Sequence, residues 1–155
     1  MNVFLPEQSV MDCVRDLDDN RLMKQILEIK VLLNGGAGYA HHPVKIFYAD
    51  KQDFLRHYGF SCCVEYYVRF GKIHKYADDF KTPFNVDNEQ WKAGIYAEGS
   101  KDSSACIRET DPLEVQRLFR EKLTRKWDTD KKPPKWTKRG SPVWYKGGYN
   151  ATQTE

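Results

Sequence analysis

The sequence predicts an all-α protein, with about three main helices joined by long irregular connections. Three segments carry apolar residues at intervals of three and four, the period of an amphipathic helix; they are residues 17–34, 50–69 and 111–127. Residues 80–104 are rich in Pro, Asn, Asp, Gly and Ser and lack a sustained period, so an irregular connection is expected there. The length of 155 residues fits a single domain, residues 1–155.

Residues 17–34 are expected to form the helix around which the chain is organised. Their apolar stripe consists of Leu22, Ile26, Ile29 and Leu33. Arg21, Lys24 and Glu28 project from one flank of the helix, spread over roughly 60° at about 100° per residue. Residues at these spacings also form ordinary surface ion pairs, so helix geometry alone leaves a structural and a functional role open for them.

The other two helices have clear boundary residues. Gly71 is expected to end the second helix, and Gly59 in its middle indicates a close crossing with another helix. Asp111 and Pro112 begin the third helix as the N-cap and the first helical residue. This helix is expected to end near Trp127.

The start of the chain is expected to pack against the body of the protein. Residues 3–5 are Val, Phe and Leu, and such an apolar run favours docking of a terminus. Ser9 can cap a short helical turn through Val14. The first residues lack the basic region of a signal peptide, and no apolar run approaches a membrane span. We therefore expect a cytoplasmic protein without membrane association.

Neither a metal site nor a cofactor is expected. The cysteines show no C-x-x-C spacing, so they are interpreted as reduced thiols; they are Cys13, Cys62, Cys63 and Cys106. His41 and His42 are adjacent and have no histidine partner one helical turn away, which disfavours metal binding. A hydrogen bond from His42 to a phosphate or a base is the preferred interpretation.

Positive charge is concentrated near the C-terminus. The whole chain carries 25 Lys and Arg against 22 Asp and Glu, a net charge of +3. Residues 120–146 hold ten basic and three acidic residues, a local charge of +7, which indicates a polyanionic partner or a solvated tail. Aromatic residues alternate with the basic ones, as in proteins that stack on bases and neutralise phosphates. Trp136 is expected to fold back into the core, whereas for Trp144 and Tyr145 both roles remain open.

Several segments in chain order resemble the pyrimidine-dimer DNA glycosylases, small helical phage repair enzymes that also act as abasic-site lyases. The segments are DDNRLMKQILE, GAGYAHHP, FYADKQDFLRHYG and VWYKGGY. RFGKIHK and KWTKRGSPVW are similar to uncharacterised phage proteins grouped with that family. The resemblance covers most of the chain except about residues 80–108, and it implies an all-α single domain that acts on duplex DNA without a cofactor. It also implies the cytoplasm of an infected bacterial host as the location.

The resemblance implies a specific chemistry. In the family, the N-terminal α-amine attacks the sugar C1′ beside a helix glutamate, which by position is Glu28 here. Arg21 and Lys24 would then bind phosphates or position the sugar. The family's nucleophile is a threonine exposed by removal of the initiator methionine. Here the second residue is Asn2, whose size disfavours that removal. The candidate catalytic residues are therefore Met1, whose amine can still attack, and Asn2, together with Glu28 and Arg21.

The expected DNA contacts extend beyond this helix. Together with Lys24, the candidate residues are His42, Lys72, His74, Lys138, Arg139, Trp144, Tyr145 and Lys146. We expect a monomer that needs no obligate protein partner. Two alternatives remain: an enzyme that processes a phage's own modified bases, and a non-catalytic DNA-binding protein.

Overall fold

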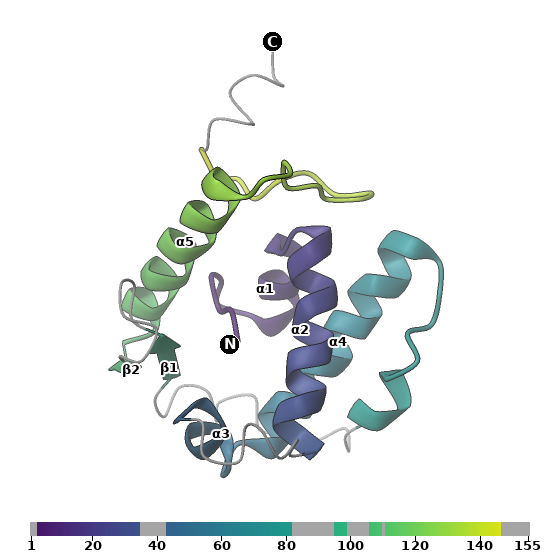
Figure 1. Cartoon of the computed structure of the whole chain (residues 1–155), viewed down its shortest axis with the longest axis vertical. Coiled ribbons are helices and arrows are strands. Elements are labelled where there is room, and N and C mark those ends of the chain that lie inside the picture. The colour runs from purple at the N-terminus through teal and green to yellow at the C-terminus, as the bar shows by residue number, and fades with distance from the viewer. Residues whose placement is uncertain (1–2, 35–42, 82–94, 99–105, 110, 147–155) are drawn as a thin grey trace.

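The computed structural model describes residues 3–34, 43–81, 95–98, 106–109 and 111–146. Helices dominate these residues, and the prediction of an all-α fold is confirmed (Figure 1). The elements in chain order are α1 (Val10–Asp16), α2 (Asp19–Asn34), α3 (Pro43–Tyr48), α4 (Gln52–Phe70), the 3₁₀ turn η2 (Ala77–Phe80), β1 (Ile95–Glu98), β2 (Cys106–Glu109) and α5 (Pro112–Thr129).

Helix α2 supplies the middle of the core. The predicted stripe is confirmed, since Leu22, Ile26 and Ile29 are fully buried and Leu33 is partly buried. Burying such side chains stabilises a fold by about 1.5–3 kcal/mol each. The opposite side of the helix faces solvent, so the apolar stripe fixes which flank α2 presents outward.

Helix α4 crosses α2 closely at Gly59, as predicted. A Cβ atom at this position would lie 3.1 Å from Ile29 Cγ2 and 3.1 Å from the Phe80 ring. The absence of a side chain therefore lets α2, α4 and η2 approach one another. Gly71 ends α4 in the left-handed conformation, with φ of 67° and its N–H donating to the carbonyl of Tyr67.

The expected caps are confirmed in α1 and α5. The Ser9 hydroxyl accepts a hydrogen bond from the N–H of Asp12, and the Asp111 carboxylate accepts one from the N–H of Leu113. Helix α5 continues to Thr129, two residues beyond the predicted end. Its buried side is made by Val115, Phe119, Leu123 and Trp127.

Two elements differ from the expectation. Strand β1 lies inside the segment expected to be irregular and pairs antiparallel with β2, with Ile95 opposite Glu109 and Glu98 opposite Cys106. Four-residue strands are too short to show a clear alternation in the sequence. The short helix α3 was also not predicted; Pro43 occupies its first position, where a missing N–H costs nothing.

The segment after α5 runs back across the N-terminal end of α2 (Figure 1). The N–H of Asp19 donates to the carbonyl of Lys135 at 2.8 Å, so this segment caps α2. Trp127 lies at the centre of an aromatic cluster, with ring centroids 5.0 Å from Trp136, 5.5 Å from Trp144 and 4.8 Å from Tyr145. The prediction that Trp136 folds back is confirmed.

Cys13, Cys62 and Cys63 are buried free thiols, as expected, whereas the side chain of Cys106 lies outside the described set. Burial raises the pKa of Cys13 and of Cys62 well above the ordinary value. Within the described residues, no helix is long and apolar enough to cross a membrane.

Candidate active site

Glu28 lies half-buried on α2, one turn after the exposed Lys24. The side-chain nitrogen of Gln25 donates a hydrogen bond to Glu28 Oε2 at 3.1 Å. The side-chain oxygen of Gln25 accepts from the backbone N–H of Phe4 at 3.2 Å. Gln25 is 1% exposed. One buried amide therefore joins the start of the chain to the carboxylate.

The N-terminal segment is held firmly beside this carboxylate. Val3, Phe4 and Leu5 are buried, as the sequence predicted. The Tyr58 hydroxyl donates to the Phe4 carbonyl at 2.6 Å, and the Phe4 ring packs edge-on against Phe119 at 5.9 Å. Helices α4 and α5 thus fix the segment from two sides. Met1 and Asn2 lie outside the described residues.

The surroundings of Glu28 shift its acidity. Burial raises the pKa of the Glu28 carboxyl above its ordinary value. The charges of the N-terminal amine and Lys24, together with the hydrogen bond from Gln25, lower it only in part. A carboxyl group with a raised pKa can exchange protons nearer to neutral pH, which is the property required of a general acid or base.

Arg21 is tied to the end of α5. Its guanidinium binds Asp130 through two hydrogen bonds, at 2.6 and 2.9 Å, and lies 3.6 Å from an Asp18 carboxylate oxygen. Only 14% of the Arg21 side chain is exposed. Through these contacts Arg21 fastens α2 to the end of α5. The expected contact of Arg21 with substrate stays a prediction.

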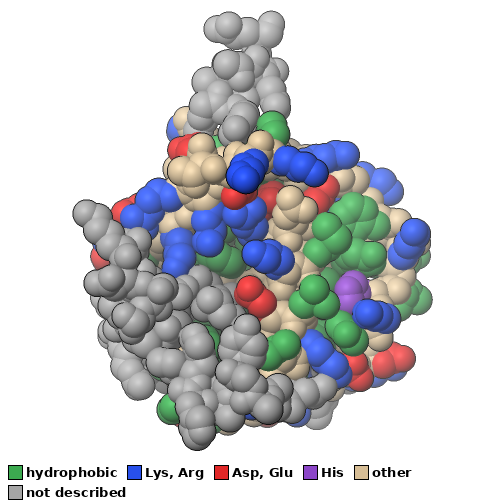
Figure 2. All heavy atoms as spheres, in the orientation of Figure 1, with side chains coloured by type: hydrophobic (Ala, Val, Ile, Leu, Met, Phe, Trp, Pro, Cys, Tyr) green, Lys and Arg blue, Asp and Glu red, His purple; other side chains and the backbone are tan. Residues whose placement is uncertain are grey.

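A hollow of about 580 Å³ opens beside this flank of α2. Its walls include Met23, Lys24 and Leu27 of α2 on one side and Asp130, Lys131 and Lys132 on the other. In the space-filling view, Lys and Arg side chains gather over α5 and the segment that follows it (Figure 2). Lys24, Lys131 and Lys132 bring three positive charges to the hollow, next to the turn that carries Glu28.

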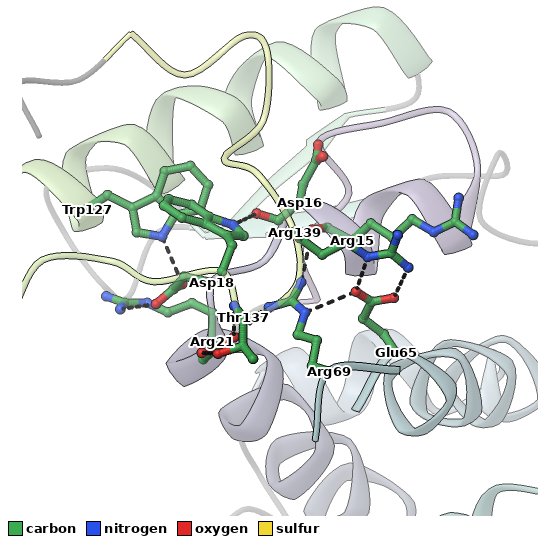
Figure 3. Close-up of polar contacts among 11 residues, drawn as sticks. Arg15, Asp16, Asp18, Arg21, Glu65, Arg69, Trp127, Thr137 and Arg139 are labelled. Carbon is green, nitrogen blue, oxygen red and sulfur yellow. Dashed lines mark hydrogen bonds and ion pairs between the residues drawn. The ribbon is translucent and has the colours of Figure 1, made fainter. Parts of the chain in front are cut away.

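Arg139, whose side chain is 32% exposed, pairs with a buried carboxylate in an ionic network (Figure 3). It donates to both oxygens of Glu65, at 2.9 and 3.0 Å, and Glu65 also accepts from Arg69 at 3.0 Å. Glu65 and Arg69 are each 1% exposed. Burial alone would raise the pKa of Glu65, but the hydrogen bonds from the two arginines lower it. These hydrogen bonds fasten the C-terminal segment to α4, and the expected contact of Arg139 with DNA stays a prediction.

The aromatic pair of the tail is also used for packing. Tyr145 is 3% exposed, and its hydroxyl donates to Asp128 at 2.8 Å. The expected contact of Tyr145 with DNA stays a prediction. Trp144 is half-buried; its Nε1 donates to Asp16 at 2.8 Å, and one face of its ring stacks on Trp127.

The remaining candidates lie in different surroundings. Lys72, Lys138 and Lys146 are exposed, so their predicted contacts with phosphates are sterically open. His74 is partly buried between Tyr66 and Tyr76, and its Nδ1 accepts the N–H of Tyr76. Burial, with a smaller effect of Lys75, lowers the pKa of His74, which favours its neutral form. His42 lies outside the described residues.

Sequence reasoning missed Gln25 and the partners of the arginines. Gln25 lies three residues before Glu28, a spacing at which helical side chains meet, and that was the only local signal. Glu65 and Arg69 are also one turn apart, but Arg139 is 74 positions from Glu65 and no periodicity connects them. The structure therefore joins a carboxylate and a buried amide to the N-terminal segment, and it places a lysine-lined hollow on the same helix α2.

Comparisons with known proteins show which family the chain belongs to. Neither the curated proteins nor the solved structures that were compared gave a match to the chain. The family model described as pyrimidine dimer DNA glycosylase matches residues 1–78, which include α1, α2, α3 and α4. Because the match covers half of the chain and contains Glu28 and the buried N-terminal segment, the protein belongs to the pyrimidine dimer DNA glycosylase family.

Proposed function

We propose that this protein is a DNA glycosylase with abasic-site lyase activity, acting on damaged or modified pyrimidines in duplex DNA. The observation that supports this best is the hydrogen-bonded path from Phe4 through Gln25 to Glu28. It holds Phe4, near the start of the chain, beside a half-buried carboxylate. In the proposed reaction, the α-amine of Met1 is the nucleophile, with Asn2 beside it.

The first stage of the reaction removes the base. A free α-amine has a pKa of about 8, so part of it is neutral and nucleophilic near pH 7. Its lone pair attacks C1′ and the amine loses a proton, while the glycosidic electron pair leaves with the base, which gains a proton. The anionic Glu28 stabilises the positive charge that develops on the sugar.

The second stage cleaves the strand. The C1′–O4′ electron pair moves onto O4′, which is protonated, and an imine forms between the amine and C1′. Removal of a C2′ proton, for which Glu28 is the proposed base, then expels the 3′ phosphate by elimination. Water hydrolyses the imine and frees the amine. The raised pKa of Glu28 supports a group that both stabilises charge and moves protons.

The DNA interface is proposed to lie on the face that carries the lysine-lined hollow. Lys24 borders that hollow, and the exposed Lys72, Lys138 and Lys146 provide additional phosphate contacts. Arg21, His42, His74 and Trp144 remain candidates for positioning the duplex. We further propose that residues 1–155 form one domain and that the protein acts as a monomer.

Borohydride trapping tests this function. The protein is mixed with a duplex carrying a pyrimidine dimer, an abasic site or neither, and the imine is reduced to a stable covalent complex. The expected result is trapping on the abasic duplex and on the dimer duplex. Chemical blocking of the N-terminal amine and the Glu28→Gln substitution should each abolish it, while DNA affinity stays within about twofold of the wild type.

The matched control is Glu121→Gln, which neutralises an exposed carboxylate on α5 far along the chain from Glu28. It should trap as the wild type does. Full trapping by Glu28→Gln would remove the catalytic assignment. Tight DNA binding without trapping on any duplex would favour the non-catalytic alternative, and trapping only on duplexes with modified bases would favour a modified-base enzyme.

A further inference from the structure

The hollow beside α2 combines two exposed apolar side chains with basic ones. Met23 is 38% exposed and Leu27 is 48% exposed, and both line the hollow. They lie one helical turn apart, so they form a short apolar row on the surface of α2. The exposed apolar surface of these two side chains lies next to basic ones, which suits a ligand with an apolar part and an anionic part.

This apolar row runs beside the row that holds the proposed catalytic carboxylate. Lys24 and Glu28 immediately follow Met23 and Leu27 in the sequence, so the second row is rotated by about 100° around α2. Glu28 and Leu27 are neighbours on the same helix, so one bound duplex can reach both rows.

The opposite wall of the hollow is suited to phosphates. Lys131 and Lys132 are exposed, and within the part of the chain that the structure describes neither forms an ion pair. Arg21, by contrast, binds Asp130 and holds this wall against α2. The lysines lie beyond residues 1–78, which the family model matches.

We propose that the hollow receives the duplex at the lesion. Met23 and Leu27 press against bases that the lesion has partly unstacked, and Lys131 and Lys132 bind the flanking phosphates. Apolar side chains inserted at a base step are a known means of kinking DNA, and a damaged step costs least to open. The proposal rests on the proposed function for its substrate, but it assigns lesion recognition to residues that take no part in the chemistry.

Binding to an unreactive lesion tests the apolar row separately from catalysis. The probe is a duplex with a tetrahydrofuran abasic-site analogue beside a 2-aminopurine, whose fluorescence rises when it unstacks; an undamaged duplex is the comparison. The wild type should raise the fluorescence and prefer the damaged duplex. Two variants are tested: Leu27→Ala alone, and the double variant with Met23→Ala and Leu27→Ala. Each should lose most of the fluorescence rise, and its preference for the damaged duplex should fall about tenfold.

The matched control is Val68→Ala, since Val68 is 40% exposed on α4 and does not line the hollow. It should keep the fluorescence rise and the preference. Lys131→Ala with Lys132→Ala should instead weaken binding to both duplexes and reduce the salt slope by about two units. Because Met23 and Leu27 are half-exposed, the variants should fold, and circular dichroism checks this.

Each outcome decides a separate statement. If Leu27→Ala keeps the wild-type preference for damaged DNA and the wild-type fluorescence rise, the proposed role of Met23 and Leu27 in lesion recognition is wrong. That conclusion holds even if borohydride trapping proceeds normally and the proposed function stands. If Leu27→Ala loses the preference for damaged DNA but the wild type shows no trapping, the role of Met23 and Leu27 in lesion recognition stands and the proposed catalytic function is wrong. Self-association of the wild type that disappears in Leu27→Ala would assign the hollow to a second copy of the chain and overturn the proposal.

Discussion

The side-chain amide of Gln25 donates a 3.1 Å hydrogen bond to Glu28, while its oxygen accepts the N–H of Phe4 at 3.2 Å. Because Gln25 is almost completely buried, water cannot easily take over either contact. The amide therefore couples the position of the N-terminal segment to that of the carboxylate. Small changes at Gln25 should affect chemistry more than they affect DNA binding.

Gln25→Glu should alter the pH dependence of trapping. The new carboxylate can still accept from Phe4, but it replaces the donor to Glu28 with a second negative charge. Two carboxylates in contact cannot both ionise freely, so the apparent pKa of the pair rises. The acid limb of the pH–rate profile for trapping should therefore move up by about one unit or more, while affinity for undamaged DNA changes little.

The control for this change is Gln116→Glu, at a partly exposed position of α5. It adds the same charge away from Glu28 and should leave the profile in place. If Gln25→Glu gives the wild-type profile, then Gln25 does not control the ionisation of Glu28, and its hydrogen bond serves only to hold Phe4.

Lys138 and Arg139 should behave differently although they are adjacent. Lys138→Ala removes an exposed charge and should reduce the salt slope of DNA binding by about one unit without loss of stability. Arg139→Ala removes one partner of Glu65 but leaves Arg69 in place, so it should lower the unfolding free energy by about 1 kcal/mol. Urea unfolding and salt-dependent binding measure the two effects.

A third variant tests the same network from its buried centre. Glu65→Ala removes one of the two carboxylates that pair with the buried Arg69 and leaves Asp19 as the other, so it should lower the unfolding free energy by about 3 kcal/mol. Equal stability of Arg139→Ala and the wild type, together with a reduced salt slope, would return Arg139 to the DNA interface.

The raised pKa of Asp16 predicts that the folded protein loses stability as the pH rises. Burial and the neighbouring Glu7 carboxyl raise the pKa of Asp16 from 3.8 to about 7, against the opposing effects of Trp144 and Arg120. The folded state therefore holds a proton that the unfolded state releases between about pH 4 and pH 7. The resulting stabilisation is complete below the unfolded pKa and is lost as the pH rises through the folded pKa.

Asp16→Asn is the matched test of this linkage. An amide keeps the acceptor for Trp144 Nε1 and offers a donor to Glu7, but it does not titrate. Thermal melts should show a smaller fall in Tm between pH 5 and pH 8 for the variant, and a higher Tm than the wild type at pH 8. A variant whose Tm follows the wild-type curve throughout would show that Asp16 is not the titrating group.

The helices could be predicted because their signals are local. The stripe on α2, the glycine at the α4 crossing and the Asp-Pro start of α5 each use residues within one or two turns of one another. The candidate carboxylate, Glu28, came from a resemblance, since its spacing alone was compatible with a surface ion pair. The family match supports that resemblance but does not test the role of the residue.

The role of the C-terminal segment could not be predicted in the same way. A basic aromatic composition is compatible with DNA binding and with packing, and only the fold decides between them. Tyr145 packs on Trp127, and Arg139 neutralises Glu65, whereas Lys138 remains exposed. Contacts between residues more than 70 positions apart leave no periodic signal in one sequence.

Asp130→Ala should make DNA binding tighter while it weakens the fold. The substitution breaks the two hydrogen bonds that fasten Arg21 to the end of α5, and at partial exposure this should cost about 1–2 kcal/mol of unfolding free energy. The substitution also removes the one carboxylate among the described residues that line the hollow, and it frees the Arg21 guanidinium to turn toward the hollow. The affinity for duplex DNA should rise about threefold to tenfold at low salt, with a steeper salt slope.

Asp128→Ala is the control, because Asp128 binds Tyr145 and does not line the hollow. Fluorescence anisotropy at several salt concentrations measures the change, and weaker binding by Asp130→Ala would show that the Arg21–Asp130 pair shapes the DNA site instead of restricting it.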